Sequence, residues 1–447
     1  MNNHIFKRSF FSALTLVIFF NNIINGQGTS DTKVRLSTDS LSLKNVIERV
    51  ITSYPTIKVA EEAIRNADSR IGLAKTGYNP QVDMIANYAN LGPVTKLSIP
   101  SFGNVQLYPA NNYSASISYQ QLVYDFGRTR QNIELENENK SIGEQTLEQV
   151  KQKLSLFTVN NFYSLVYLQA AIIIKEEQLA ALNEHLQYIE KMRATGSATE
   201  YQLLSTKVKI STVESQKVDL VATLTAQKAL LNSLLGNDQI INPVVKNELQ
   251  VEPPVIPSDS ILSYAYHKRD EVLINEKKTS LAELKLGMTK LQNKPLISLQ
   301  ASGGAKNGYI PNLNKPTPNY VIGFGLRVPL FDGMKNKYNI SQAQSAITSL
   351  SYESEFTKRN ISNEVYESEA FMFAANKKVI QLELQLKQAI EAYSLAETSF
   401  KSGVITNLDL LDANTAVSES RLMLLKARID YAASIYKLKA ALGERLY

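Results

Sequence analysis

The chain has 447 residues, with 48 Lys and Arg against 42 Asp and Glu, and it has no cysteine. The formal charge of +6 is weakly basic and its charges are scattered, which argues against nucleic-acid binding. The lack of cysteine excludes disulfides and an acylated N-terminal cysteine, so we expect a protein that is not a lipoprotein.

The N-terminus is typical of a secretory signal. Lys7 and Arg8 precede an apolar run over residues 10–20, which small and polar residues around Gly26 follow. The run has eleven residues (20 − 10 + 1), whereas a transmembrane helix needs roughly 20. We therefore predict a cleaved signal peptide over residues 1–26.

The remaining chain repeats itself at a fixed separation. ATGSATEYQLLST at 194–206 is similar to KSGVITNLDLLDA at 401–413, and the glycines of the two stretches are 207 residues apart (403 − 196). Asp125 and Asp332 have the same separation (332 − 125). Such self-similarity predicts a tandem duplication. The predicted parts are a first repeat at 27–236, an extended proline-bearing connector at 237–257 and a second repeat at 258–447.

The first repeat reads as a helix, two strands and two further helices. Apolar spacing predicts a helix over 37–78, which Pro55 interrupts. Alternating apolar residues then predict a β-hairpin over 81–124, with a loop at 92–112. A long helical hairpin over 126–236 follows, because the 70 residues from 126 to 195 (195 − 126 + 1) contain no proline. A helix of that length measures about 105 Å.

The second repeat has the same order of elements. We predict a helix over 258–293, a β-hairpin over 296–331 and a long helical hairpin over 333–443. Its apolar residues are spaced alternately three and four apart, which indicates coiled-coil packing. The clearest example comprises Val379, Leu382, Leu386, Ala389, Tyr393, Ala396 and Phe400.

The strands and helices together imply a tunnel. Each predicted strand has about 8 to 12 residues, close to the roughly 9 to 11 that a tilted strand needs to cross a bilayer. Four strands cannot close a barrel, and an open sheet edge in lipid is costly, so several copies of the chain must close it together. Three copies give a barrel of twelve strands, and their long helices continue it as a hollow tube.

Several motifs carry a resemblance to a known family. A proline precedes the first strand of each β-hairpin, at Pro80 and Pro295. LVYDFG at 122–127 and VPLFDG at 328–333 join a strand to a long helix, and each helical turn has the pattern Gly-x-x-Thr followed by Leu-Leu. Over essentially the whole mature chain, the sequence resembles the TolC family of outer-membrane efflux proteins, also called outer membrane factors.

The resemblance implies a fold and a function. The fold is mainly α with membrane β: a homotrimer with a 12-stranded barrel in the lipid of the Gram-negative outer membrane, continued by an α-helical barrel in the periplasm. The function is that of a passive exit channel for tripartite efflux or type I secretion. The implied partners are a periplasmic adaptor and an inner-membrane RND or ABC transporter, with no nucleic acid and no cofactor.

The resemblance also assigns site residues. Asp409 and Asp412 match an acidic pair at the pore constriction, where three copies would form a ring of six carboxylates. Gln202 and Ile405 replace residues that can form a salt bridge in the family, so we expect apolar packing around Phe400 and Leu410 to hold the closed state. The predicted tip and adaptor contacts are Gly196, Thr199, Leu203, Leu204, Gly403, Thr406, Leu410 and Leu411. The predicted barrel-to-helix junction comprises Pro80, Asp125, Gly127, Pro295, Pro329, Asp332 and Gly333.

Other interpretations remain open at this point. Paired acids on a helix are often a solvated surface, and Gly196 and Gly403 can serve simply as helix C-caps. A structural periplasmic coiled-coil or adaptor protein without a pore explains the helices but not the paired strands. His185 and His267 lie far apart in sequence without partners, so we expect neither a catalytic nor a metal site and no enzyme activity.

Overall fold

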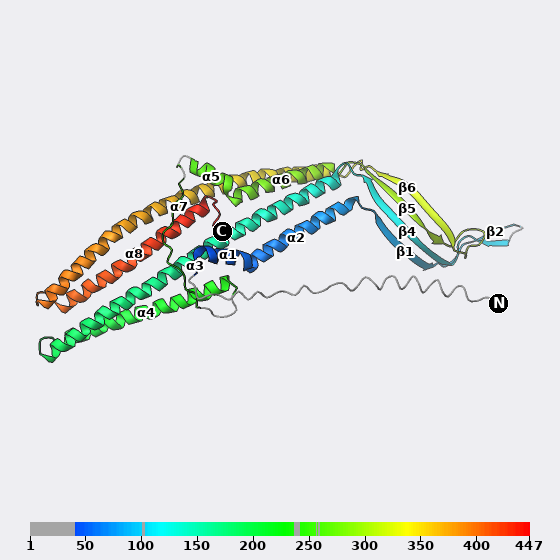
Figure 1. The fold of residues 1–447 in the computed structure, drawn as a ribbon. Coiled ribbons are helices and arrows are strands. Elements are labelled where there is room, and N and C mark those ends of the chain that lie inside the picture. Colours follow the sequence, from blue (N-terminus) through cyan, green and yellow to red (C-terminus); the bar gives the residue numbers. More distant parts are fainter. Residues whose placement is uncertain (1–40, 101–102, 237–241, 256, 258–259) are drawn as a thin grey trace, which may run out of the picture. The chain divides into compact units, whose positions relative to one another are not determined.

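The computed structural model describes residues 41–447, apart from 101–102, 237–241, 256 and 258–259. The predicted signal peptide and its cleavage site lie outside the described residues. The described elements are α1 (Leu43–Ser53), α2 (Pro55–Lys75), the short 3-10 helix η1 (Thr76–Tyr78), β1 (Gln81–Asn90), β2 (Lys96–Ile99), β3 (Gly103–Gln106), β4 (Asn111–Tyr124), α3 (Arg128–Ala194), α4 (Glu200–Leu234), α5 (Ile261–Lys268), α6 (Asp270–Leu291), β5 (Leu296–Lys306), β6 (Thr317–Arg327), α7 (Lys335–Lys401) and α8 (Asn407–Ala441) (Figure 1).

Long helices dominate both halves of the chain. The proline-free run over 126–195 and its counterpart over 333–402 contain α3 and α7, which have 67 residues each. The return helices α4 and α8 have 35 residues each, and they pack along α3 and α7 as two helical hairpins (Figure 1). Equal lengths in both halves agree with a duplicated chain.

A four-stranded antiparallel sheet has the order β1-β4-β5-β6, so β4 and β5 join the two repeats. Residues paired across strands share a face of a sheet. One such ladder is Val82, Tyr119, Ala301 and Ile322, and the next is Asp83, Ser118, Ser302 and Val321. One face is therefore mainly apolar and the other mainly polar. The apolar face includes Val82, Met84, Tyr88, Ile117, Tyr119, Leu299, Tyr320, Ile322, Phe324 and Leu326.

Two strand predictions need correction. The segment predicted as a loop at 92–112 contains the small antiparallel pair β2 and β3, and β4 begins at Asn111. The second β-hairpin is predicted to extend to residue 331, but its last strand, β6, ends at Arg327. Arg327 pairs with Leu296, the first residue of β5, so β6 has no further partner residue in β5 beyond this point.

The helix predicted over 258–293 is broken at Arg269, which separates α5 from α6. Arg269 has φ −70° and ψ 126°, nearly the angles of Tyr54 at the break between α1 and α2 (−69° and 132°). Pro55 occupies the first position of α2, where proline is well tolerated. The break at Arg269 forms without a proline. We therefore infer that the repeated architecture requires a break at this position, and that Pro55 is compatible with the break in the first repeat but is not its cause.

The main core lies where α3 passes α1, α4, the connector and α8. Phe162, Leu165 and Val159 of α3 are fully buried there, and Val245 of the connector packs against them. The most apolar 18-residue window of α3 has the composition of a membrane span, yet half of it is buried in the protein. We therefore attribute the apolar character of α3 to this core.

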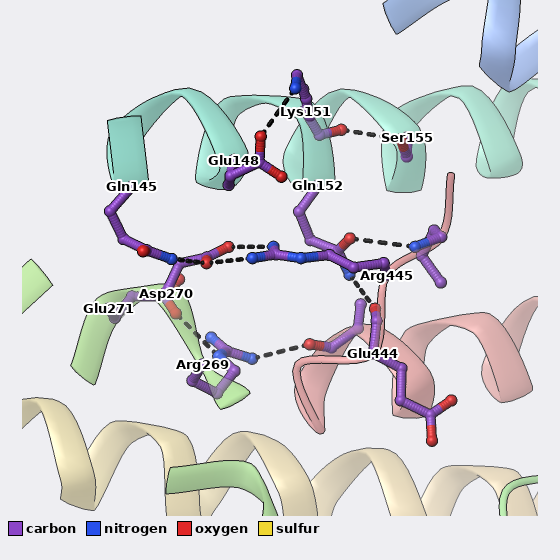
Figure 2. A network of polar contacts seen from close by, with 12 residues as sticks. Gln145, Glu148, Lys151, Gln152, Ser155, Arg269, Asp270, Glu271, Glu444 and Arg445 are labelled. Atoms are coloured by element: carbon purple, nitrogen blue, oxygen red, sulfur yellow. Dashed lines mark hydrogen bonds and ion pairs between the residues drawn. The ribbon is translucent and has the colours of Figure 1, made fainter. Parts of the chain in front are cut away.

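The last described residues of the chain are tied to α3 and α6 (Figure 2). The guanidinium of Arg445 contacts both carboxylate oxygens of Asp270, at 2.6 and 2.7 Å. Gln145 of α3 donates to the same carboxylate at 2.5 Å. The amide of Gln152 accepts from the N–H of Leu446 at 3.2 Å. These contacts hold the end of the second repeat against the long helix of the first.

Gly443 allows the break at Arg269 to form, because a Cβ at Gly443 would lie 2.8 Å from the carbonyl carbon of Lys268 and 2.9 Å from the nitrogen of Arg269. Its counterpart Gly236 (443 − 207) has a similar positive φ, +68° against +77°, but open space around it. We expect Gly236→Ala to cost about 1–2 kcal/mol of unfolding free energy, from backbone strain alone. Gly443→Ala should cost at least about 1 kcal/mol more. Urea unfolding of both variants in detergent measures the difference, and equal losses would contradict the close packing.

Candidate functional site: the helical tips and the strand-to-helix junction

The two helical turns are built alike. Gly196 and Gly403 have φ of +78° and +73°, in the left-handed region that favours glycine. The N–H of each glycine donates to the carbonyl three residues earlier, at 3.0 and 2.9 Å. The next N–H donates to the carbonyl five residues earlier, at 2.8 and 2.9 Å. Both glycines are thus Schellman C-caps, which end α3 and α7 at the tips.

Thr199 and Thr406 begin the return helices as N-caps. Each hydroxyl accepts the N–H of the third helical residue at 3.2 Å. In return, Gln202 and Asp409 accept the N–H of their threonine at 2.8 Å. Each turn therefore has a reciprocal capping box.

Asp409 consequently has a local structural role at the predicted constriction. Its carboxylate also accepts the hydroxyl of Thr406 at 2.7 Å. Hydrogen bonds from the hydroxyl and then the N–H of Thr406 hold the pKa of Asp409 below its usual value. Asp409 is therefore ionised throughout the neutral range. Asp412 is also exposed, one turn further along α8.

Three of the leucines predicted to contact an adaptor are buried. Leu203, Leu410 and Leu411 are 3–5% exposed and pack within the protomer, so they support the tip from inside. Leu204 is 52% exposed, although its repeat counterpart Leu411 is buried. The exposed large apolar side chains of the two tips are Tyr201, Leu204, Val404 and Leu408.

A small apolar cluster joins the two hairpins near their tips. Ile189 of α3, Leu203 of α4, Phe400 of α7 and Leu410 of α8 are its buried members. Phe400 and Leu410, the pair expected to hold the tip by apolar packing, thus lie in one cluster with both helices of the other hairpin.

Sequence reasoning missed a polar contact beside this cluster. Asn407, the first residue of α8, is 3% exposed, and its amide oxygen lies 2.6 Å from the ring nitrogen of His185. Its amide nitrogen donates to the hydroxyls of Ser205 and Thr206, each at 3.2 Å. The repeat comparison contains a signal for this contact. The counterpart of Asn407 is the charged Glu200 (407 − 207), and an uncharged amide is buried at a lower cost than an unpaired carboxylate.

The strand-to-helix junctions repeat one cap. Asp125 accepts the N–H of Thr129 at 2.6 Å, and Asp332 accepts the N–H of Asn336 at 2.9 Å, four residues on in both cases. Burial raises the pKa of Asp125, but its hydrogen bonds from Thr129 and Gly127 outweigh burial and lower it overall. A hydrogen bond from Asn293, followed by that from the Asn336 N–H, lowers the pKa of Asp332.

Two consecutive left-handed residues turn the chain at each junction. They are Phe126 and Gly127 at the first (φ +59° and +88°) and Gly333 and Met334 at the second (+67° and +71°). Pro80 and Pro295 lie directly before β1 and β5, where a missing N–H interrupts no ladder. Pro329 lies two residues after the end of β6.

The described residues contain no group of three or more His, Asp or Glu side chains placed to hold a metal ion. His185 contacts Asn407, and His267 contacts the backbone oxygen of Ser263 at 2.7 Å. Neither of these contacts is with a carboxylate. The helix caps described above fix the two helical turns and the two strand-to-helix junctions, and so position the exposed side chains of the tips.

The chain is similar to known proteins in sequence and in structure. The model of a family described as outer membrane efflux protein matches residues 46–237 and 280–444. The outer membrane protein TolC of Salmonella enteritidis is 19% identical over 427 residues, which cover 92% of this chain and 85% of TolC. The alkaline protease secretion protein AprF of Pseudomonas aeruginosa is 21% identical over 340 residues, which cover 74% and 70%. The Campylobacter jejuni CmeC outer membrane channel has a TM-score of 0.76 at 16% identity and covers 90% of this chain and 85% of its own.

Proposed function

The chain belongs to the outer membrane efflux protein family, and we propose that it acts there as a passive exit channel of a tripartite efflux or type I secretion system. Membership confirms the family predicted from the sequence. Relatives are named for protease secretion and for solvent or toluene efflux. The family consists of channel proteins. The cargo of this chain can be a secreted protein, as the protease secretion relative suggests, or an organic solvent, as the solvent and toluene efflux relatives suggest.

The observation that carries the proposal is the two-faced sheet with open edges. Its mainly apolar face suits lipid, and its mainly polar face suits an aqueous lumen. β1 and β6 are its outer strands, and within the described part of the chain neither has a second partner strand. In a membrane these edges need partners, which other copies of the chain supply. Three copies close a barrel of twelve strands that the helical hairpins continue into the periplasm.

The helical tips are the surface to which the other proteins of the export system bind. A periplasmic adaptor, and through it an inner-membrane RND or ABC transporter, docks there. The exposed apolar side chains Tyr201, Leu204, Val404 and Leu408 supply the contact area. The capping boxes and glycine C-caps keep both turns rigid, which lowers the entropy lost on docking.

Asp409 and Asp412 form the selective constriction of this channel. Both are exposed on α8, and a trimer would bring six carboxylates together. Such a ring attracts cations, repels anions and binds a multivalent cation as a blocker. Because Asp409 also caps α8, its charge and its cap have to be separated in any test.

The experiment is single-channel conductance in planar bilayers with a trivalent cation. The double variant Asp409→Asn/Asp412→Asn removes the charges, while the amide oxygen introduced at position 409 can still accept the Thr406 N–H. We expect wild type to show a small, cation-selective conductance, and the double variant to lose selectivity and bind the blocker about tenfold more weakly or worse.

Thr406→Ala is the matched control, because it removes the hydroxyl of the cap and keeps both charges. It should stay cation-selective and blocked. Equal block in wild type and the double variant would contradict the constriction but leave the channel standing. A folded, membrane-extracted trimer without conductance would favour the structural coiled-coil alternative.

A further inference from the structure

Asn407, the first residue of α8, joins the second helical hairpin to both helices of the first. It is 3% exposed, and its amide oxygen lies 2.6 Å from Nε2 of His185 on α3. Its amide nitrogen donates to the backbone oxygen of Gln202 at 3.3 Å and to the hydroxyls of Ser205 and Thr206 at 3.2 Å, all on α4. Both polar atoms of this buried amide are therefore paired with atoms of the other hairpin.

The partners on α4 fix the orientation of the Asn407 amide. A carbonyl can only accept a hydrogen bond, so the amide nitrogen faces Gln202 and the amide oxygen faces His185. The hydroxyls of Ser205 and Thr206 donate to the same carbonyl at 3.0 and 2.8 Å, which leaves their lone pairs to accept from Asn407. His185 then donates from Nε2, because an amide oxygen can only accept. These contacts are directional, unlike those of the apolar cluster beside them.

The first repeat forms the same turn without such a contact. Glu200 is the counterpart of Asn407 (407 − 207), and it is exposed. Its carboxylate pairs with Arg193 of α3 at 2.8 Å, within its own hairpin. Both turns have the same capping box, so the turn itself does not require the contacts of Asn407. The contact between the hairpins therefore needs another explanation.

The explanation lies in the residues that follow Asn407 on α8. Asp409 is two residues further on, and its carboxylate accepts the N–H of Thr406 within the same turn. Movement of this turn away from the first hairpin would break all the hydrogen bonds of Asn407 together. Hydrogen bonds that are lost together oppose such a movement more strongly than any one of them alone.

We propose that Asn407 is a positioning residue of the constriction. It holds the first turn of α8, and with it Asp409, against the first hairpin, while His185 holds Asn407. This role rests on the proposed channel function, because it concerns the width of the pore at Asp409. Release of Asn407 should let the tips separate and widen the pore.

The test combines two measurements on the purified full-length protein. Asn407→Ala removes the amide, and in planar bilayers the ratio of open to closed time should rise about tenfold or more above that of wild type. Hydrogen exchange in detergent follows the backbone of α8 without requiring a current. The amides of residues 409–415 should exchange faster in the variant than in wild type.

Asn161→Ala is the matched control, because it removes another buried amide. Asn161 of α3 is 4% exposed and donates to the side-chain oxygen of Gln227 on α4 at 2.7 Å, so its contact lies within one hairpin. This variant should keep the wild-type ratio and the wild-type exchange at residues 409–415. Circular dichroism checks that each variant is folded.

Two variants of His185 separate its hydrogen bond from its ring. His185→Phe keeps a ring beside Phe400, whose centroid lies 5.4 Å from that of His185, but removes the donor. His185→Gln removes the ring and keeps an N–H donor. The Phe variant should raise the ratio about fivefold, and the Gln variant should stay near wild type. The reverse order would overturn the role of His185, and both variants carry the test if Asn407→Ala does not fold.

The outcomes distinguish the contact from the channel. An unchanged ratio in Asn407→Ala would overturn the proposal, whatever the exchange at residues 409–415. An equal rise in Asn161→Ala would overturn it as well, because the effect would then be a general loosening of the helices. Faster exchange in Asn407→Ala without any current, even from wild type, would support the hold of Asn407 on α8 and contradict the channel function instead.

Discussion

Arg445→Leu should cost about 3 kcal/mol of unfolding free energy, the largest loss that we expect from a single substitution outside the β-sheet. The change leaves Asp270, whose side chain is 5% exposed, with the amide of Gln145 as its remaining side-chain partner (Figure 2). A buried carboxylate without its cation is expensive, and this accounts for most of the loss. We place the value at the low end of the range for buried pairs because Arg445 itself is 35% exposed.

A double-mutant cycle in urea, in detergent, separates the pair from its surroundings. Asp270→Leu/Arg445→Leu removes both charges and should recover much of the stability that either single change loses. Lys437→Leu is the matched control, because its ion pair with Glu367 is about half exposed at both ends. That control should cost less than about 1 kcal/mol. Equal losses of unfolding free energy for Arg445→Leu and Lys437→Leu would show that the contact with Asp270 stabilises the protein no more than an exposed ion pair does.

The sequence predicted the elements whose cause is local. The proline-free runs with apolar residues three and four apart form α3 and α7. The stretches with alternating apolar residues form β1, β4, β5 and β6. The turn glycines and threonines could be predicted as well, because a C-cap followed by a capping box is a short-range signal. These features depend only on residues within a few positions of one another.

The missed features depend on residues far apart in the chain. The break at Arg269 is shaped by Gly443, 174 residues later (443 − 269), and no proline marks it. Leu204 and Leu411 match in sequence, but only Leu411 packs with Ile210 and Leu182. Asn407 was passed over because its partner His185 lies on another helix. A repeat specifies equivalent backbones, whereas burial depends on which neighbour each copy meets.

The sheet allows the sharpest test of the membrane assignment, because two adjacent residues of β6 point to opposite faces. Ile322 belongs to the apolar face with Ala301, and Val321 belongs to the polar face with Ser302. Ile322→Lys should cost about 2–4 kcal/mol of folding free energy in lipid if Ile322 lies near the bilayer midplane. Val321→Lys should fold almost normally and shift the ion selectivity of the pore towards anions, because its charge would face the lumen of the proposed barrel.

The measurement is urea unfolding in lipid vesicles, with heat-modifiable migration of the trimer on gels as a check of assembly. The same lysine at neighbouring positions makes the two variants each other's control, since helix content, net charge and side-chain size are the same. Loss of folding with Val321→Lys but not with Ile322→Lys would reverse the two faces. If neither variant folded, each face of the sheet would have to be buried against protein. If both variants folded normally, neither face would lie in lipid. Only the selective failure of Ile322→Lys fits a barrel wall with lipid on one side and water on the other.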